Sequence, residues 1–129
     1  MTFGISLASQ YNEASGNIWM FGDHIGLDFN QSPPSLIKNT AILFQESCAS
    51  VSDCNGQLLF YTNGLEVFNN NHSIMPNGGN IMGDPSSTMG AMISPVLGKH
   101  LQHYLFVTDG SSATGGVGPK DKFDGLLIL

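Results

Sequence analysis

The chain has 129 residues, of which 41% are hydrophobic and only 11% are charged, so its solubility depends on uncharged polar side chains rather than on ion pairs. Ten acidic residues stand against four basic ones, for a formal net charge of −6. This balance argues against nucleic acid as a partner, because phosphate contacts need Lys and Arg. No apolar run approaches the roughly 20 residues of a membrane-spanning helix, so we expect no membrane insertion.

The N-terminal segment, Met1 to Gln10, is a short apolar stretch followed by small residues. It fits either the remnant of a secretory signal or an ordinary first strand. Beyond it, Asn-Gly and Asp-Gly pairs recur and suit tight hairpin turns. The runs between them have the length of strands and are too short for helices; they are 17–22, 48–53, 58–62, 65–68, 91–96 and 104–108. The sequence therefore predicts an all-β fold of antiparallel sheets.

The pair Asn55-Gly56 predicts a hairpin whose register can be worked out. A two-residue loop pairs Ser52 with Leu59, Val51 with Phe60 and Ser50 with Tyr61. One face of the hairpin then carries Ala49, Val51, Leu58 and Phe60, and the other carries Cys48, Ser50, Leu59 and Tyr61. Neither face is plainly polar, as a sheet packed on both sides requires.

An internal repeat gives the expected architecture. The stretch 58–64, Leu-Leu-Phe-Tyr-Thr-Asn-Gly, recurs 46 residues later (Phe60 to Phe106) as Tyr-Leu-Phe-Val-Thr-Asp-Gly. Upstream, Ala-Ser-Val-Ser at 49–52 is echoed 42 residues later by Ala-Met-Ile-Ser at 91–94, and we assign the difference to a longer connection from Pro95 to His103. A repeat of about 40 to 50 residues containing several short strands is the period of a β-propeller blade.

We therefore expect residues 11–129 to form an incomplete β-propeller of two to three four-stranded blades, with blade-like repeats around 47–64 and 88–110. Closed propellers have roughly four to eight blades. The expected partners are accordingly the remaining blades or domains of a longer protein.

A series of short motifs adds a family resemblance: Asn17-Ile-Trp-Met-Phe-Gly22, Gly26-Leu-Asp-Phe-Asn30, Pro33-Pro34, Cys48-Ala-Ser-Val-Ser-Asp53, Gly56-Gln-Leu-Leu-Phe-Tyr-Thr-Asn-Gly64, Val67-Phe-Asn69, His72, Ile74-Met-Pro-Asn-Gly78 and Ser86-Ser-Thr88. In this order they resemble the N-terminal propeller region of large surface proteins of gliding bacteria that use type IX secretion. The resemblance implies an N-terminal signal, a WD40-like propeller and, in longer relatives, PKD or other immunoglobulin-like domains before a gliding-motility-associated C-terminal sorting domain. It implies secretion to the cell surface and no settled enzymatic activity.

Where such relatives tend to have an acidic turn residue, a Trp and a Gln, this chain has Asn63, Phe68 and Met89. The first two replacements keep the turn and the strand viable. The third puts a polar role at position 89 in doubt.

Four residues are the candidate ligand-binding set: Asp23, His24, Asp28 and His72. The first three form a polar group suited to a cation or a sugar, and a hairpin turn with a surface His is the simpler interpretation. We predict no metal site and no cofactor, because the pair His100 and His103 lacks a third ligand. Five aromatic residues are expected in the core, with one or two of them available to stack on a sugar: Trp19, Phe21, Phe60, Tyr61 and Phe106.

Further features have simple structural interpretations. Cys48 and Cys54 lie roughly 20 Å apart on one extended strand at ~3.3 Å per residue, too far for a disulfide. The glycine-rich stretch 110–118 is an inter-strand loop rather than a phosphate cradle, because no Lys-Ser or Lys-Thr follows it. Four acidic residues suggest a paired-carboxylate hydrolase only if the fold brings two of them together: Asp28, Glu46, Asp53 and Glu66.

The leading functional interpretation is a non-enzymatic structural and recognition module of an exported bacterial surface protein, which binds glycan or protein through its blade loops. One alternative is a carbohydrate-active hydrolase or a metal-dependent enzyme on a propeller scaffold. The other is a small β protein that associates with itself through an exposed sheet.

Overall fold

The computed structural model describes residues 13–43, 46–81, 83–84, 87–108 and 125–128. Within these ranges the chain forms nine β-strands and one 3-10 turn, η2 (Glu13–Gly16). The strands make three antiparallel sheets, and each sheet consists of three strands in chain order. The all-β prediction is confirmed. The predictions for 1–10 and for the loop at 110–118 fall outside the described residues.

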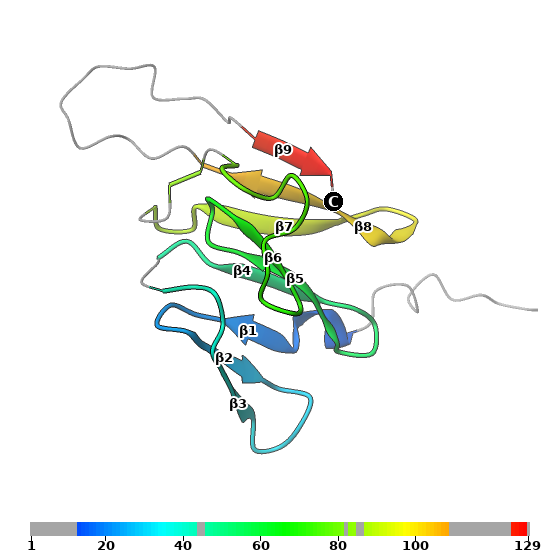
Figure 1. Ribbon diagram of the computed structural model, residues 1–129. Helices are drawn as coiled ribbons and strands as arrows, with labels where there is room; N and C mark the ends of the chain where they lie inside the picture. The colour runs from blue at the N-terminus through cyan, green and yellow to red at the C-terminus, as the bar shows by residue number, and fades with distance from the viewer. Residues whose placement is uncertain (1–12, 44–45, 82, 85–86, 109–124, 129) are drawn as a thin grey trace, which may run out of the picture.

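Each sheet is a simple up-and-down meander (Figure 1). The first sheet contains β1 (Ile18–Met20), β2 (Ile25–Asp28) and β3 (Ser35–Lys38). The middle sheet contains β4 (Ala49–Ser52), β5 (Leu58–Thr62) and β6 (Val67–Asn69). The third sheet contains β7 (Ala91–Val96), β8 (Lys99–Val107) and β9 (Gly125–Ile128).

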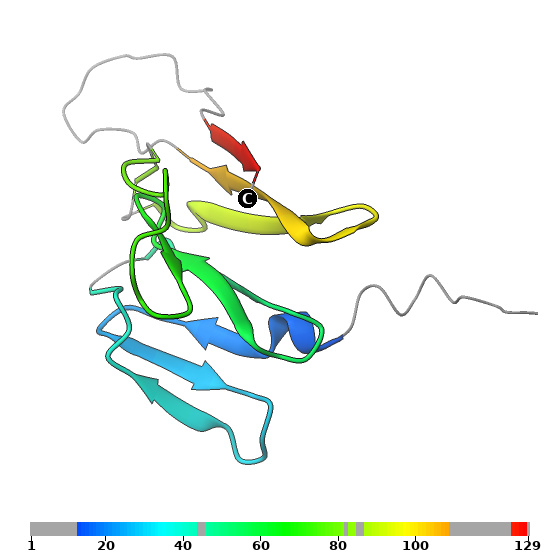
Figure 2. The same ribbon diagram turned by 45° about the vertical axis from the view of Figure 1, so that its right-hand side comes forward.

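The three sheets stack face to face and diverge from one another on one side (Figure 2). Their first strands lie next to one another, because β4 contacts both β1 and β7. The second and third strands of the first and middle sheets lie further from this line (Figures 1 and 2). The face of a sheet that looks toward the next sheet in the chain is its front face, and the face that looks toward the preceding one is its back face.

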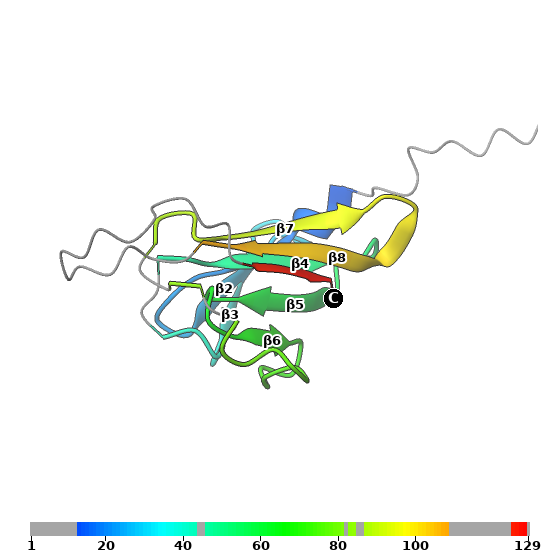
Figure 3. The ribbon, with the colours of Figure 1, turned by 90° about the horizontal axis from the view of Figure 1, so that it is seen from above.

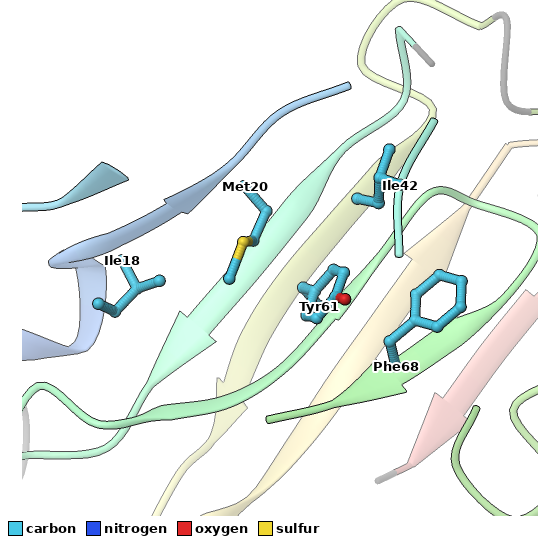
Figure 4. Packing of buried hydrophobic residues seen from close by; sticks show 5 residues of the cluster. All are labelled: Ile18, Met20, Ile42, Tyr61 and Phe68. Atoms are coloured by element: carbon cyan, nitrogen blue, oxygen red, sulfur yellow. The ribbon is translucent and has the colours of Figure 1, made fainter. Parts of the chain in front are cut away.

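Two separate hydrophobic cores hold the stack together. The first core lies between the first and middle sheets and consists of Ile18, Met20, Ile42, Tyr61 and Phe68 (Figure 4). The second core lies between the middle and third sheets and consists of Val51, Phe60, Val67, Leu105 and Val107. Burying a side chain of this size contributes about 1.5 to 3 kcal/mol. The middle sheet is therefore covered on both faces, as the unusually apolar hairpin predicted.

The hairpin register is confirmed at Val51–Phe60 and at Ser50–Tyr61. It is wrong beyond them, because a bulge shifts the pairing so that Ser52 lies opposite Leu58. Leu58 consequently packs against the first core and Leu59 against the second, the reverse of the predicted faces.

The physical cause of the shift lies in the turn. The Asp53 carboxylate accepts hydrogen bonds from the N–H groups of Asn55 and Gln57, at 2.8 and 2.9 Å. The Gly56 N–H donates to the Asp53 carbonyl, and Gly56 has a φ of 79°. The loop is therefore longer than two residues.

The third sheet corrects the expected connection from Pro95 to His103. Residues of this stretch pair directly, Pro95 lying opposite His103, and β8 already begins at Lys99. The tight turn falls at Leu97 and Gly98, where Gly98 has a φ of 75°. Pro95 is tolerated because β7 is an edge strand, where a missing N–H costs no ladder hydrogen bond. Figure 3 shows this long hairpin extending past the end of the middle sheet.

In the downstream half of the internal repeat, matched residues lie on equivalent faces of their sheets. Tyr61 and Val107, which are 46 residues apart, both lie on the back faces of their sheets, in the first and second core respectively. The upstream half does not. Val51 lies on the front face of the middle sheet, whereas Ile93, 42 residues later, packs from the back face of the third sheet against the second core. The match between 49–52 and 91–94 therefore joins residues that point in opposite directions.

The expectation of four-stranded blades is also corrected, since each sheet has three strands in the part of the chain that the structure describes. Beyond β6 the middle sheet gains an isolated bridge between Phe68 and Ile74 and scattered backbone hydrogen bonds, such as the one from the Met75 N–H to the Val67 carbonyl, but no further strand in the described residues. The following residues turn instead of extending, with φ values of 62° at His72 and 60° at Asn77. The strand predicted at 65–68 likewise starts only at Val67, because the Asn63 side chain caps the turn before it.

Candidate ligand-binding surface

Asp23 and His24 lie together in the exposed turn between β1 and β2, with φ values of 62° and 59°. Both bind the segment that leads to the middle sheet. The Asp23 N–H donates to the Leu43 carbonyl, and the His24 N–H donates to the Ile42 carbonyl at 2.7 Å. The His24 ring also donates from Nδ1 to the Thr40 carbonyl at 2.6 Å. The turn therefore fastens the segment 40–43 that supplies Ile42 to the first core.

Asp28 ends β2 and caps the turn that follows. Its Oδ1 accepts from both the backbone N–H and the side-chain amide of Asn30, each at 2.8 Å. The same Asn30 amide donates to the Gly56 carbonyl at 2.8 Å. A Cβ at Gly56 would overlap the Asn30 amide, so only glycine allows this contact between the first and middle sheets.

His72 lies at the outer edge of the middle sheet and forms a hydrogen bond with Tyr61, whose hydroxyl is 2.9 Å from His72 Nδ1. The same hydroxyl accepts from the Ala41 N–H at 2.9 Å, so its own proton can be donated to the ring nitrogen. Burial raises the pKa of Tyr61, and the hydrogen bond from Ala41 partly opposes that change. His72 thus orients a core tyrosine.

The four candidate residues therefore do not meet at one site. Asp23 and His24 share a turn, and Asp28 caps a different one. His72 reaches the segment 40–43 only through Tyr61. Each side chain of the set except Asp23 has a hydrogen-bond partner within the chain itself, and their clearest contribution is to connect the first and middle sheets.

A pocket lies beside the first strands, away from the four candidate residues. It has a volume of about 310 Å³ and lies between β1 and β4, lined by Gly16, Ile18, Trp19, Met20, Phe21, Cys48, Ala49 and Ser50. The Ser50 hydroxyl donates to the Ile18 carbonyl at 2.7 Å and joins the two strands there. Burial raises the pKa of the Cys48 thiol on the same wall.

Trp19 is the largest side chain of the pocket, and 53% of its surface is exposed. Its indole Nε1 donates to the Gly16 carbonyl at 2.8 Å, which fixes the ring. Phe29 packs against it with ring centroids 5.0 Å apart, and Phe21 packs edge-on at 6.4 Å. The three rings form an exposed aromatic cluster. The prediction that Trp19 and Phe21 are core residues is wrong, while Phe60 and Tyr61 are buried as predicted.

The other candidate chemistry is dispersed. Asp53 caps its own turn, Asp28 binds Asn30, and Glu46 is exposed. In the described ranges no group of three or more His, Cys, Asp or Glu side chains is placed to hold a metal ion. His103 is buried against Phe60, with ring centroids 5.5 Å apart, and burial lowers its pKa.

Comparison with known proteins adds no assignment. No protein-family model matches the chain, and no curated protein or solved structure is significantly similar to it. Among the described residues, no helix has the length and apolar character needed to cross a membrane.

Proposed function

We propose that this chain is a non-enzymatic structural and recognition module of an exported bacterial surface protein, built as part of a β-propeller, and that it binds a neutral glycan at the Trp19 pocket. Support for the propeller comes from the stacking of three successive meanders with their first strands adjacent. Support for export and surface display comes from the resemblance of the motif series to the type IX-secreted proteins of gliding bacteria.

The observation that carries the recognition part is the exposed and fixed indole of Trp19 beside a pocket of about 310 Å³. A planar aromatic face that is held in place suits the apolar C–H face of a sugar ring. The Ser50 hydroxyl on the opposite strand supplies a polar group of the kind that sugar hydroxyls require. A net charge of −6 favours neutral sugars over uronic acids or sulfated chains.

The test is retention of the purified chain on a panel of immobilised neutral oligosaccharides built from glucose, mannose or N-acetylglucosamine, compared with polygalacturonate. We expect retention on at least one neutral glycan and its loss in Trp19→Ala. Leu97→Ala is the matched control, since Leu97 is 85% exposed on the distant hairpin turn. Retention on no neutral glycan, or retention unchanged by Trp19→Ala, would overturn the recognition proposal.

The same incubations examine the hydrolase alternative. Chromatography of the soluble oligosaccharides after incubation should show no shortened products. Release of products that depends on the chain would replace a binding module with an enzyme.

A further inference from the structure

Both outermost faces of the stack carry large apolar side chains. On the back face of the first sheet, Trp19 lies opposite Leu27 and Leu27 lies opposite Leu36, so a row of large apolar residues crosses all three strands. Trp19 is 53% exposed and Leu36 is 51% exposed. Within the described residues, no sheet packs on this face.

The front face of the third sheet has the same character. Met92 lies opposite Phe106, and Ser94 lies opposite Tyr104. Met92 is 55% exposed, and the rings of Tyr104 and Phe106 are in contact with centroids 6.2 Å apart. The back face of this sheet, by contrast, packs Leu105 and Val107 into the second core.

These two faces correspond to the two sides of a sheet-to-sheet contact that the chain already makes twice. The front face of the first sheet packs on the back face of the middle sheet, and the front face of the middle sheet packs on the back face of the third. One back face, on the first sheet, and one front face, on the third, are left over. A front face and a back face complement each other, whereas two identical faces do not reproduce the existing contact.

We propose that a second copy of this chain covers both faces, with the third sheet of each copy packed on the first sheet of the other. The two copies then form a closed head-to-tail ring of six sheets, since each copy supplies three. That number falls within the roughly four to eight blades of closed propellers. Closure removes both apolar faces from water.

The inference rests on the stacked-sheet scaffold of the proposed function and not on its ligand, which would compete with the second copy because Trp19 lies on the face that this copy covers. A chain that binds glycan as a monomer would overturn the ring and leave the recognition proposal intact. A dimer that binds no glycan would do the reverse.

The experiment measures mass by light scattering after size-exclusion chromatography of the whole chain over a hundredfold range of concentration. We expect twice the mass of the chain. Leu36→Lys places a charge on the back face of the first sheet, and Met92→Lys places one on the front face of the third. Every junction in the ring contains one altered face in either variant, so each variant should be monomeric with a cooperative unfolding transition. Leu97→Lys, on the exposed hairpin turn, should remain dimeric.

Mixing the two variants tests the head-to-tail arrangement itself. Leu36→Lys keeps an intact front face and Met92→Lys keeps an intact back face, so the mixture should form a heterodimer through one intact junction. Neither variant should pair with itself. A folded wild-type monomer at every concentration, dimers in both variants, or a mixture that stays monomeric would each overturn the proposal.

Discussion

Removing the Tyr61 hydroxyl tests how the first core is held in place. Tyr61 is fully buried, and its ring stacks on Phe68 with centroids 5.2 Å apart. Tyr61→Phe keeps this ring and deletes only the oxygen that accepts from the Ala41 N–H and binds His72 Nδ1. A buried group left without its partner costs about 1 to 3 kcal/mol. Because Ala41 and His72 are both half-buried, we expect a loss of about 1 to 2 kcal/mol.

The assay is urea unfolding followed by circular dichroism. With a denaturant dependence of about 1 to 3 kcal/mol per molar urea, the transition midpoint should fall by roughly 1 M. Tyr104→Phe is the matched control, because the Tyr104 hydroxyl has no hydrogen-bond partner among the described residues and its removal should change stability by less than about 0.5 kcal/mol. Equal effects of the two substitutions would refute the assigned role of the Tyr61 hydroxyl.

Three further predictions probe other parts of the fold. Burial lowers the pKa of His103, so its contribution to stability should be present above the ordinary pKa of about 6.5 and should be lost as pH falls below that value. His103→Gln should therefore reduce the loss of stability at acid pH in urea titrations. An unchanged loss of stability would contradict the assignment. Both Gly56 and Gly98 have a positive φ, so Gly98→Ala should cost about 1 to 2 kcal/mol from this backbone strain alone. Gly56→Ala should cost more, since of the two only the Cβ at Gly56 meets a side chain. Thermal melting ranks the two variants, and the opposite order would refute the inter-sheet contact. Leu105→Ala should cost about 2 to 5 kcal/mol, whereas Leu101→Ala on the same strand should cost under about 0.5 kcal/mol because Leu101 is 73% exposed; similar costs would place the second core elsewhere.

The sequence predicted local structure well where turn chemistry decides it. The Asn55-Gly56 hairpin, the strands flanking it and the burial of both its faces follow from residue types alone. The exchange of Leu58 and Leu59 could not be predicted in the same way. It depends on the Asp53 carboxylate capping two backbone N–H groups, which lengthens the loop and introduces the bulge.

Elements were missed where the signal is short or interrupted. Strands β2 and β3 were not predicted from the sequence, because β2 is interrupted by Gly26 and β3 directly follows Pro33 and Pro34. Pro95 suggested an interruption, yet it is accommodated on the edge of the third sheet. Edge position is a property of the assembled sheet and cannot be read from the residues around a proline.

In the candidate site too, the sequence predicted local turns but not contacts between distant segments. The sequence identified Asp23 and His24 as turn residues, and the structure places both in the turn between β1 and β2. It could not show that His72 binds Tyr61. Alternation along 18–20 predicts that Trp19 points away from its neighbours, but only the packing of the middle sheet against Ile18 and Met20 determines which side is exposed.

The central claim is that two consecutive residues of β5, Phe60 and Tyr61, belong to different cores that join the middle sheet to its two neighbours. Nuclear Overhauser contacts between side chains in solution test it most directly. We predict contacts from the Phe60 ring to the His103 ring and to the Leu105 methyl groups, and separate contacts from the Tyr61 ring to the Met20 methyl group. Contacts from both rings to one shared set of neighbours, or no contact from either ring to an adjacent sheet, would contradict the stacked-sheet architecture.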